Sequence, residues 1–215
     1  MPIYLTVIVP FLSDSFESNA YLVVGDRCCV IDPGINPDNV LIHSREYNII
    51  PDVLINTHCH FDHVGAVPEL VKAGFSSVFT HIECAPALEC GDDSLQLASL
   101  FGAEPIFCKV SRKLAGEDVI DVGGVILEVI HTPGHTRGSI CLYEPESMSL
   151  ITGDTVFKEG VGRTDLKGGS LAELEKSINA LVGLVEERGV EKIYPGHGPV
   201  GCGEDIIRAY EEYFS

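Results

Sequence analysis

The sequence predicts a mixed α/β fold, in which two β-rich halves pack their sheets face to face with helices on the outside. Short apolar runs bounded by Gly, Pro and Asp, which are typical of strands, occur in both halves of the 215 residues. Helical periodicity returns between and after these runs. The length suits one domain, so we expect a single domain over residues 1–215.

The first half is predicted to mix strands with helices. Strands are expected at residues 3–9, 19–24, 27–31, 53–56 and 77–80, and helices at 37–47 and 64–73. Gly25-Asp26 predicts a hairpin turn, and Asp32-Pro33-Gly34 ends the strand before it. Residues 84–103 are expected to form a short helical insertion.

The second half is predicted to be richer in strands. They are expected at residues 106–110, 119–121, 125–130, 139–143, 149–152 and 192–194. Ser170 opens a strongly amphipathic helix to residue 188, because Ser170 and Glu173 fit a capping box and Gly189 suits the helix end. A last helix is expected over 204–213.

Charge and hydropathy limit the partners. The net charge is −18, from 32 acidic and 14 basic residues, so we expect no nucleic-acid partner. No apolar run approaches the roughly 20 residues of a membrane span, and no basic start precedes an apolar stretch. We therefore expect no membrane partner and a cytoplasmic protein. Eight cysteines without a Cys-x-x-Cys pair are interpreted as small buried hydrophobes in a reducing compartment.

Four metal donors fall within six residues: His58, His60, Asp62 and His63. They follow a predicted strand and precede a predicted helix. Residues two apart in an extended segment point the same way, so His58 and His60 converge on one ion. The helical turn that follows brings Asp62 and His63 onto another. Imidazole and carboxylate donors suit zinc, and also iron or manganese.

Three further donors stand at the ends of predicted strands: His135, Asp154 and His197. Each is preceded by Gly, which lets the backbone turn sharply and aim the side chain into a cleft. Each motif alone is also compatible with an ordinary turn. Together with the first four, they supply seven candidate ligands, enough for two ions.

The motifs together resemble those of the metallo-β-lactamase superfamily. They are His-x-His-x-Asp-His at 58–63, Pro-Gly-His-Thr at 133–136, Gly-Asp-Thr-x-Phe at 153–157 and Pro-Gly-His-Gly at 195–198. The resemblance runs from about residue 18 to 197. It is greatest to the short single-domain relatives of the glyoxalase II (hydroxyacylglutathione hydrolase) branch. It implies a four-layer αββα sandwich with the site at one edge, between the sheets.

The resemblance also implies roles for these residues. His58, His60 and His135 would hold the first metal, Asp62, His63 and His197 the second, and Asp154 would bridge two zinc ions (or iron or manganese). A hydroxide shared by the metals would attack a thioester, with Asp62 and Asp154 as the catalytic carboxylates and Asp62 orienting the hydroxide. A thiolate leaves readily, so no general acid is required.

Three nearby residues have two interpretations each. Asp32 is either a partner of a ligand histidine, as the resemblance implies, or only the turn residue of Asp-Pro-Gly. Arg163 either contacts a substrate carboxylate or pairs with Asp165 at the cleft rim.

Related activities of the superfamily remain as alternatives. One is a mononuclear iron persulfide dioxygenase using His58, His135 and Asp154, and another is a catalytically silent metal-binding protein. Zinc β-lactamases generally lack the bridging aspartate, so Asp154 counts against them. Position 199 is Pro, and 18 residues follow His197, whereas glyoxalase II carries a tyrosine at that place and a helical extension. Glutathione, another thiol carrier and a small acyl ester therefore stay open as substrate components, and the oligomeric state is not predicted.

Overall fold

The computed structural model describes residues 7–46 and 52–215. In this part of the chain the first sheet has the strand order β1-β2-β3-β4-β5-β6. Its strands are β1 (Val7–Phe11), β2 (Ala20–Val24), β3 (Cys28–Ile31), β4 (Val53–Asn56), β5 (Ser77–His81) and β6 (Arg112–Leu114). Neighbouring strands are antiparallel from β1 to β3 and parallel from β3 to β6.

The second sheet has the order β13-β10-β9-β8-β7. Its strands are β7 (Val119–Val122), β8 (Val125–His131), β9 (Ile140–Glu144), β10 (Ser149–Gly153) and β13 (Lys192–Pro195). Only the β10–β13 pair of this sheet is parallel in the described chain. A small hairpin of β11 (Val156–Phe157) and β12 (Gly160–Val161) was not expected from the sequence.

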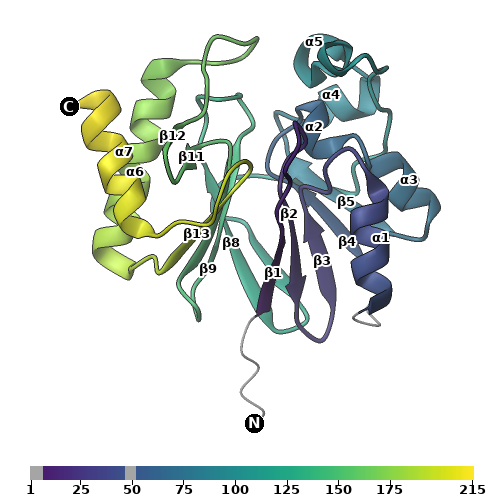
Figure 1. Ribbon diagram of the computed structural model, residues 1–215, viewed down its shortest axis with the longest axis horizontal. Coiled ribbons are helices and arrows are strands. Elements are labelled where there is room, and N and C mark those ends of the chain that lie inside the picture. The colour runs from purple at the N-terminus through teal and green to yellow at the C-terminus, as the bar shows by residue number, and fades with distance from the viewer. Residues whose placement is uncertain (1–6, 47–51) are drawn as a thin grey trace.

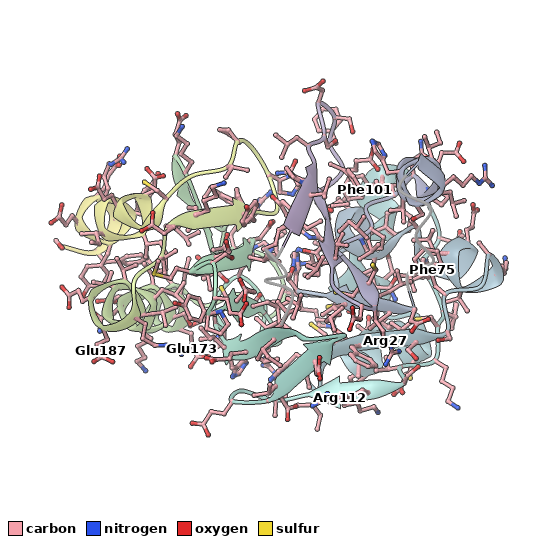
Figure 2. All side chains as sticks on the ribbon, turned by 90° about the horizontal axis from the view of Figure 1, so that it is seen from below. Arg27, Phe75, Phe101, Arg112, Glu173 and Glu187 are labelled. Carbon is pink, nitrogen blue, oxygen red and sulfur yellow. The ribbon has the colours of Figure 1, made fainter. Side chains whose placement is uncertain are left out.

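Helices cover the outer face of each sheet. On the first sheet lie α1 (Pro37–Glu46), α2 (Phe61–Val64), α3 (Val67–Lys72), α4 (Ala85–Cys90), α5 (Asp93–Gln96) and the 3₁₀ turn η1 (Ala98–Phe101). On the second lie α6 (Leu171–Arg188) and α7 (Gly203–Phe214). The four-layer αββα order predicted from the sequence is confirmed (Figure 1). Viewed from below, the two helical layers stand at opposite ends, with side chains filling the space between them (Figure 2).

Alternation along the central strands builds three layers of core. In β4, Val53 and Ile55 face the second sheet, whereas Leu54 packs under the helices of the first. In β9, Leu142 joins the inter-sheet core, whereas Tyr143 packs against α6 and α7. Both faces of these strands are therefore apolar, as expected for sheets covered on both sides. No helix in the described chain is both long and apolar enough to cross a membrane.

The expected strand at residues 106–110 is wrong. This segment has no regular structure, and β6 forms at Arg112–Leu114 instead. The side chain of Gln96 accounts for the difference, since its Oε1 accepts from Ile106 N at 2.8 Å and its Nε2 donates to Ile106 O at 2.9 Å. An amide side chain from α5 thus takes the place of a strand partner.

The expected helix at residues 64–73 is divided in two. The first, α2, begins at Phe61, and α3 begins at Val67. Pro68 stands in the first turn of α3, where a missing N–H costs nothing. The insertion at 84–103 is helical, as predicted. Residues 3–6 of the first expected strand and residue 47 of the expected helix lie outside the described residues, and β1 continues to Phe11.

All eight cysteines are unpaired. Five are buried, Cys108 and Cys202 are half-buried, and Cys90 is exposed. The prediction of buried hydrophobes thus holds for most of them.

Candidate metal centre

The segment after β4 carries four of the candidate ligands. Thr57 directly follows β4 and is held by Asp32, which directly follows β3 and accepts from Thr57 N at 2.7 Å and from Thr57 Oγ1 at 2.6 Å. The chain bends at residues 57 and 58, and His60 is extended (φ −66°, ψ 145°) before α2 begins at Phe61. His58 and His60 therefore turn toward the edge between the sheets, whereas Cys59 turns into the core under the helices.

The other three ligands come from the second half of the chain. His135 follows β8, Asp154 follows β10 and His197 follows β13. The preceding glycines have the predicted effect for two different reasons. Gly153 has φ +48°, and a Cβ there would lie 2.5 Å from Thr57 Oγ1. A Cβ at Gly196 would lie 2.1 Å from Asp154 Oδ1, so this glycine makes room for the neighbouring ligand.

The seven predicted ligands come together in three overlapping groups. They are His58–His60–His135, His58–His63–Asp154 and Asp62–His63–His197, and within each group the donor atoms lie within 4.8 Å of one another. Each group takes two residues from the half that ends with β6 and one from the half that begins with β7. The centre therefore lies at the junction of the two halves.

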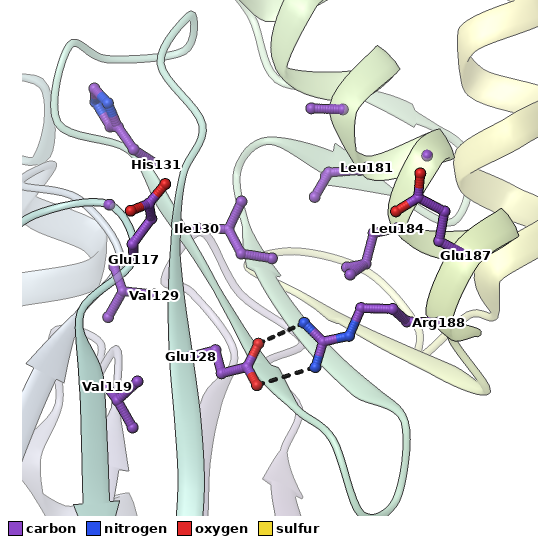
Figure 3. Close-up of a pocket in the computed structure, with 13 residues that line it drawn as sticks. Glu117, Val119, Glu128, Val129, Ile130, His131, Leu181, Leu184, Glu187 and Arg188 are labelled. Atoms are coloured by element: carbon purple, nitrogen blue, oxygen red, sulfur yellow. Dashed lines mark hydrogen bonds and ion pairs between the residues drawn. The ribbon is translucent and has the colours of Figure 1, made fainter.

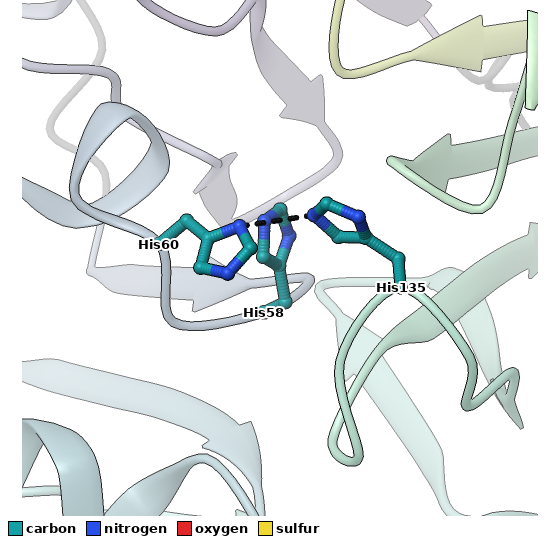
Figure 4. Close-up of side chains that lie close together, drawn as sticks. All are labelled: His58, His60 and His135. Carbon is teal, nitrogen blue, oxygen red and sulfur yellow. Dashed lines mark hydrogen bonds between the residues drawn. The ribbon is translucent and has the colours of Figure 1, made fainter. Parts of the chain in front are cut away.

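The first group consists of three imidazoles on two loops (Figure 4). His135 Nε2 and His60 Nδ1 lie 2.9 Å apart, and the rings of His58 and His60 are 4.7 Å apart and nearly perpendicular. All three side chains are almost fully buried. Their nitrogens converge on one point, as the sequence predicted.

The group of Asp62, His63 and His197, called the second group from here on, is more polar and more open. His197 Nε2 lies 3.1 Å from Asp62 Oδ2, and the His197 side chain is 34 % exposed. Asp154 lies between the groups, with Oδ1 3.3 Å from His63 Nε2 and Oδ2 3.5 Å from His135 Nε2. Its two oxygens thus face one histidine from each group.

Several buried donor atoms at this centre have no hydrogen-bond partner. They are His58 Nε2, His63 Nε2 and Asp154 Oδ1. A buried polar atom without a partner lowers stability by between about 1 and several kcal/mol, so such atoms are rare in folded proteins. Divalent cations would satisfy all three at once, and the imidazole and carboxylate donors are those that zinc and iron accept. The residues present therefore fit a pair of divalent ions.

Burial and mutual repulsion keep His58 and His60 neutral. Burial lowers the pKa of His58 well below its ordinary value, and the neighbouring imidazoles lower it further. Burial, together with His135, lowers the pKa of His60 to about 3. Because a histidine must be neutral to bind a metal, these two residues are prepared as ligands at physiological pH.

The carboxylates set a different balance in the second group. Burial opposes ionisation of Asp154, but His63, His135 and His197 outweigh it, so the pKa of Asp154 lies well below its ordinary range. Burial likewise lowers the pKa of His63, yet Asp154, Asp32 and Asp62 reverse the effect and raise it well above the ordinary value. Asp62 and Asp154, whose pKa values are both lowered, are thus the anionic ligands of this centre.

Asp32 orients one histidine of each group. Its Oδ2 accepts from His63 Nδ1 at 2.9 Å, which turns His63 Nε2 toward the centre. Because the Thr57 hydroxyl donates its hydrogen to Asp32, the Thr57 oxygen is left to accept a hydrogen bond from His58 Nδ1 at 3.2 Å. Asp32 also has a positive φ of +49°, a conformation that non-glycine residues rarely adopt. Of the two interpretations of Asp32, the partner of a ligand histidine is the one that the structure favours.

Arg163 contributes through its backbone. Its carbonyl oxygen accepts from His135 Nδ1 at 2.8 Å, which turns His135 Nε2 toward the centre. Its side chain forms a two-pronged ion pair with Asp165 at 2.8 and 2.7 Å, on the exposed rim. The sequence did not predict that the Arg163 carbonyl orients His135. It also did not predict that Thr57 connects Asp32 to His58, for which the only signal was a threonine directly before His58.

A hollow elsewhere in the molecule contains none of these ligands. It has a volume of about 640 Å³ and lies between β8 and α6 (Figure 3). Arg188 of α6 spans it to Glu128 of β8, with N–O distances of 2.6 and 3.0 Å. Arg188 and Glu128 neutralise each other, and we assign this hollow no chemistry.

Comparison with known proteins places the chain in a family. The model of the metallo-β-lactamase superfamily matches residues 14–197. A probable metallo-hydrolase of Methanocaldococcus jannaschii is 43 % identical over 194 residues, which are 86 % of this chain and 90 % of that protein. An acyl-coenzyme A thioesterase of Gallus gallus is 31 % identical over 230 residues, covering 95 % of this chain and 81 % of that protein.

Solved structures agree with this placement. A B3 metallo-β-lactamase superposes with a TM-score of 0.87 at 28 % identity, covering 97 % of this chain and all of that one. A protein solved in a di-iron-bound form superposes with a TM-score of 0.81 at 34 % identity, covering 94 % of this chain and 98 % of that one. From the match to the family model and the 43 % identical relative, the chain belongs to the metallo-β-lactamase superfamily.

Proposed function

We propose that this protein is a binuclear metal-dependent hydrolase of thioesters. The observation that carries the proposal is the set of three overlapping ligand groups, because the third of them, Asp62–His63–His197, offers a complete set of donors for a second ion. His58, His60 and His135 would hold one ion, Asp62, His63 and His197 the other, and Asp154 both. The acyl-coenzyme A thioesterase of Gallus gallus supports a thioester as the substrate.

Two bound divalent ions would polarise the substrate carbonyl and supply a nucleophilic water at neutral pH. The protein's own residues then orient the attacking water and neutralise charge at the centre. Asp62, whose pKa stays lowered because His63 and His197 outweigh its burial, is an anion facing the centre. Its Oδ2 can accept a hydrogen bond from the attacking water and so orient it. The departing thiolate needs no protonation, because its pKa is about 8.5, far below that of an alcohol.

The metal is proposed to be zinc or iron. Both accept this mixture of imidazole and carboxylate, and the 34 % identical structure was solved in a di-iron form. Purification without oxygen from cells supplied with both metals, followed by elemental analysis, should find about two ions per chain.

The activity is tested with a panel of acyl-CoA and small thioesters, by following the released thiol. Turnover is expected from the loaded protein, and none from His60→Ala. The matched control is His43→Ala, a histidine of α1 outside the three groups. A fully loaded protein that cleaves no thioester contradicts the proposal. One iron per chain with persulfide-dependent oxygen uptake would replace it with the dioxygenase alternative.

A further inference from the structure

A pocket of about 290 Å³ adjoins the first ligand group and has no role in holding metal. One wall comes from the first half of the chain, with Cys59, Cys84 and Leu95, and the other from the second half, with Thr136, Arg137 and Lys167. It therefore lies at the same junction between the halves as the metal centre.

The pocket shares its two loops with the three histidines. Cys59 stands between His58 and His60, and Thr136 directly follows His135. Consecutive Cα atoms are about 3.8 Å apart, so the backbone of both walls continues directly into that of the ligand histidines, although the Cys59 side chain points to the opposite side from His58 and His60. A substrate whose reacting carbonyl reaches the metals can extend one arm into this space.

The inner part of the pocket is apolar and lined by sulfur. Cys59 and Cys84 are both buried, and Cys59 Sγ contacts Leu95 O at 3.8 Å. The second half closes tightly on this surface, since a Cβ at Gly138 would lie 2.6 Å from Cys84 Sγ. Thiols and a leucine form a polarisable, non-ionic surface that suits an alkyl or thioether chain.

The rim carries two cations in a chain of net charge −18. Arg137 and Lys167 are both exposed at the opening. Lys167 bonds Ser94 and stands 3.8 Å from Asp92, whereas Arg137 has no carboxylate within ion-pair distance anywhere in the described chain. Glu83 lies on the same rim and offsets part of the positive charge. Arg137 is therefore the cation left to pair with a ligand.

We propose that this pocket binds one arm of the thioester substrate, and that the arm ends in an anion, either a carboxylate or a phosphate, held by Arg137 and Lys167. The inference rests on the proposed function. It narrows the substrate class to thioesters with an anionic group at the end of a short apolar chain. Arg137 and Lys167 are binding residues that determine specificity, and neither takes part in the bond-breaking step.

The test uses thioethers, which have no carbonyl and are not hydrolysed. The probes are 3-(butylthio)propanoate, its amide, and 2-(butylthio)ethyl phosphate. Their binding to the metal-loaded protein is measured by calorimetry. At least one anion should bind about tenfold more tightly than the amide, as expected for a charge-assisted hydrogen bond. The tighter of the two anions identifies the terminal group.

The variants decide where the anion is held. Arg137→Gln and Lys167→Gln should each weaken binding of the anion about five- to tenfold and leave the amide unchanged. Glu83→Gln should strengthen it, because the opposing charge is gone. The matched control is Lys192→Gln, an exposed lysine at the start of β13 that lies outside this pocket. Equal affinities in the wild type, Arg137→Gln and Lys167→Gln would overturn the proposal.

Binding and turnover separate the two proposals. If the protein cleaves thioesters but Arg137→Gln binds the anions as the wild type does, the pocket proposal fails and the function stands. If anion binding depends on Arg137 but no thioester is cleaved, the proposed function fails and the pocket remains an anion site.

Discussion

The two outer ligand groups differ in charge and exposure. His58, His60 and His135 are all imidazoles and are nearly fully buried, whereas Asp62, His63 and His197 include a carboxylate and a histidine whose side chain is 34 % exposed. Apart from Asp154, which would serve both ions, the first group offers only imidazoles, and these neutralise none of an ion's charge. An ion in the second group is partly neutralised by Asp62. The first group is therefore better suited to polarise a carbonyl, and the second to exchange water and protons with solvent.

Removal of Asp154 should abolish this difference by weakening both groups. Its two oxygens face His63 and His135 at 3.3 and 3.5 Å. Asp154→Ala should lose metal from both groups and reduce hydrolysis more than the roughly 10- to 100-fold that loss of a ligand's hydrogen-bonding partner costs. Elemental analysis and thiol release measure the two effects. An Asp154→Ala protein that keeps two ions contradicts the bridging role.

Loss of one histidine from each group should separate the groups. His197→Ala should leave about one ion per chain, bound by the intact imidazole group. His60→Ala should instead leave about one ion in the second group. It should also lower stability, because it opens a space beside the buried His58 and His135. Elemental analysis with thermal unfolding checks both. Loss of both ions from either variant would mean that the groups do not bind independently.

Asp32→Asn tests the residue that serves both groups. Asp32 Oδ2 accepts from both Thr57 and His63, and an amide nitrogen at that place can accept from neither. Affinity for both ions should fall about 10- to 100-fold. Chelator competition measures it. The control is Asp165→Asn, which removes a carboxylate from the exposed pair with Arg163 and should leave metal affinity unchanged.

The stacked pair of His81 and His131 shows the effect of burial on imidazoles outside the metal centre. Their rings lie 4.1 Å apart, and burial, together with His131, lowers the pKa of His81 to about 4. Between pH 6.5 and 4, His81 binds a proton in the unfolded chain but not in the folded protein. The free energy of unfolding therefore falls as the pH decreases from 6.5 toward 4, and His81 causes no such loss above pH 6.5.

Urea unfolding at several pH values checks this smallest of the effects. His81→Gln should flatten the pH dependence in that window by up to about one proton per chain. An unchanged slope in His81→Gln would mean that other groups carry it. The pH dependence of His81→Gln is compared with that of the wild type, so that the contribution of the ligand histidines, which both proteins share, cancels.

The layers and the ligand set were predictable because both have local signatures. Three histidines and an aspartate within six residues, and glycines before the other donors, are visible in the sequence. Interactions distant along the chain were not. Gln96 replaces a strand at residue 106, the Arg163 carbonyl orients His135, and Arg137 and Cys84 meet across one pocket. Such contacts depend on how the halves pack, and no periodicity records them.

Each ligand group takes two residues from the half before β7 and one from the half after it. Bound ions therefore fasten the two halves together, and neither half alone holds a complete group. Ligands that bind only the joined form add their binding free energy to its stability. Two fragments divided between β6 and β7 and produced separately should thus reassemble in the presence of metal and separate when a chelator removes it.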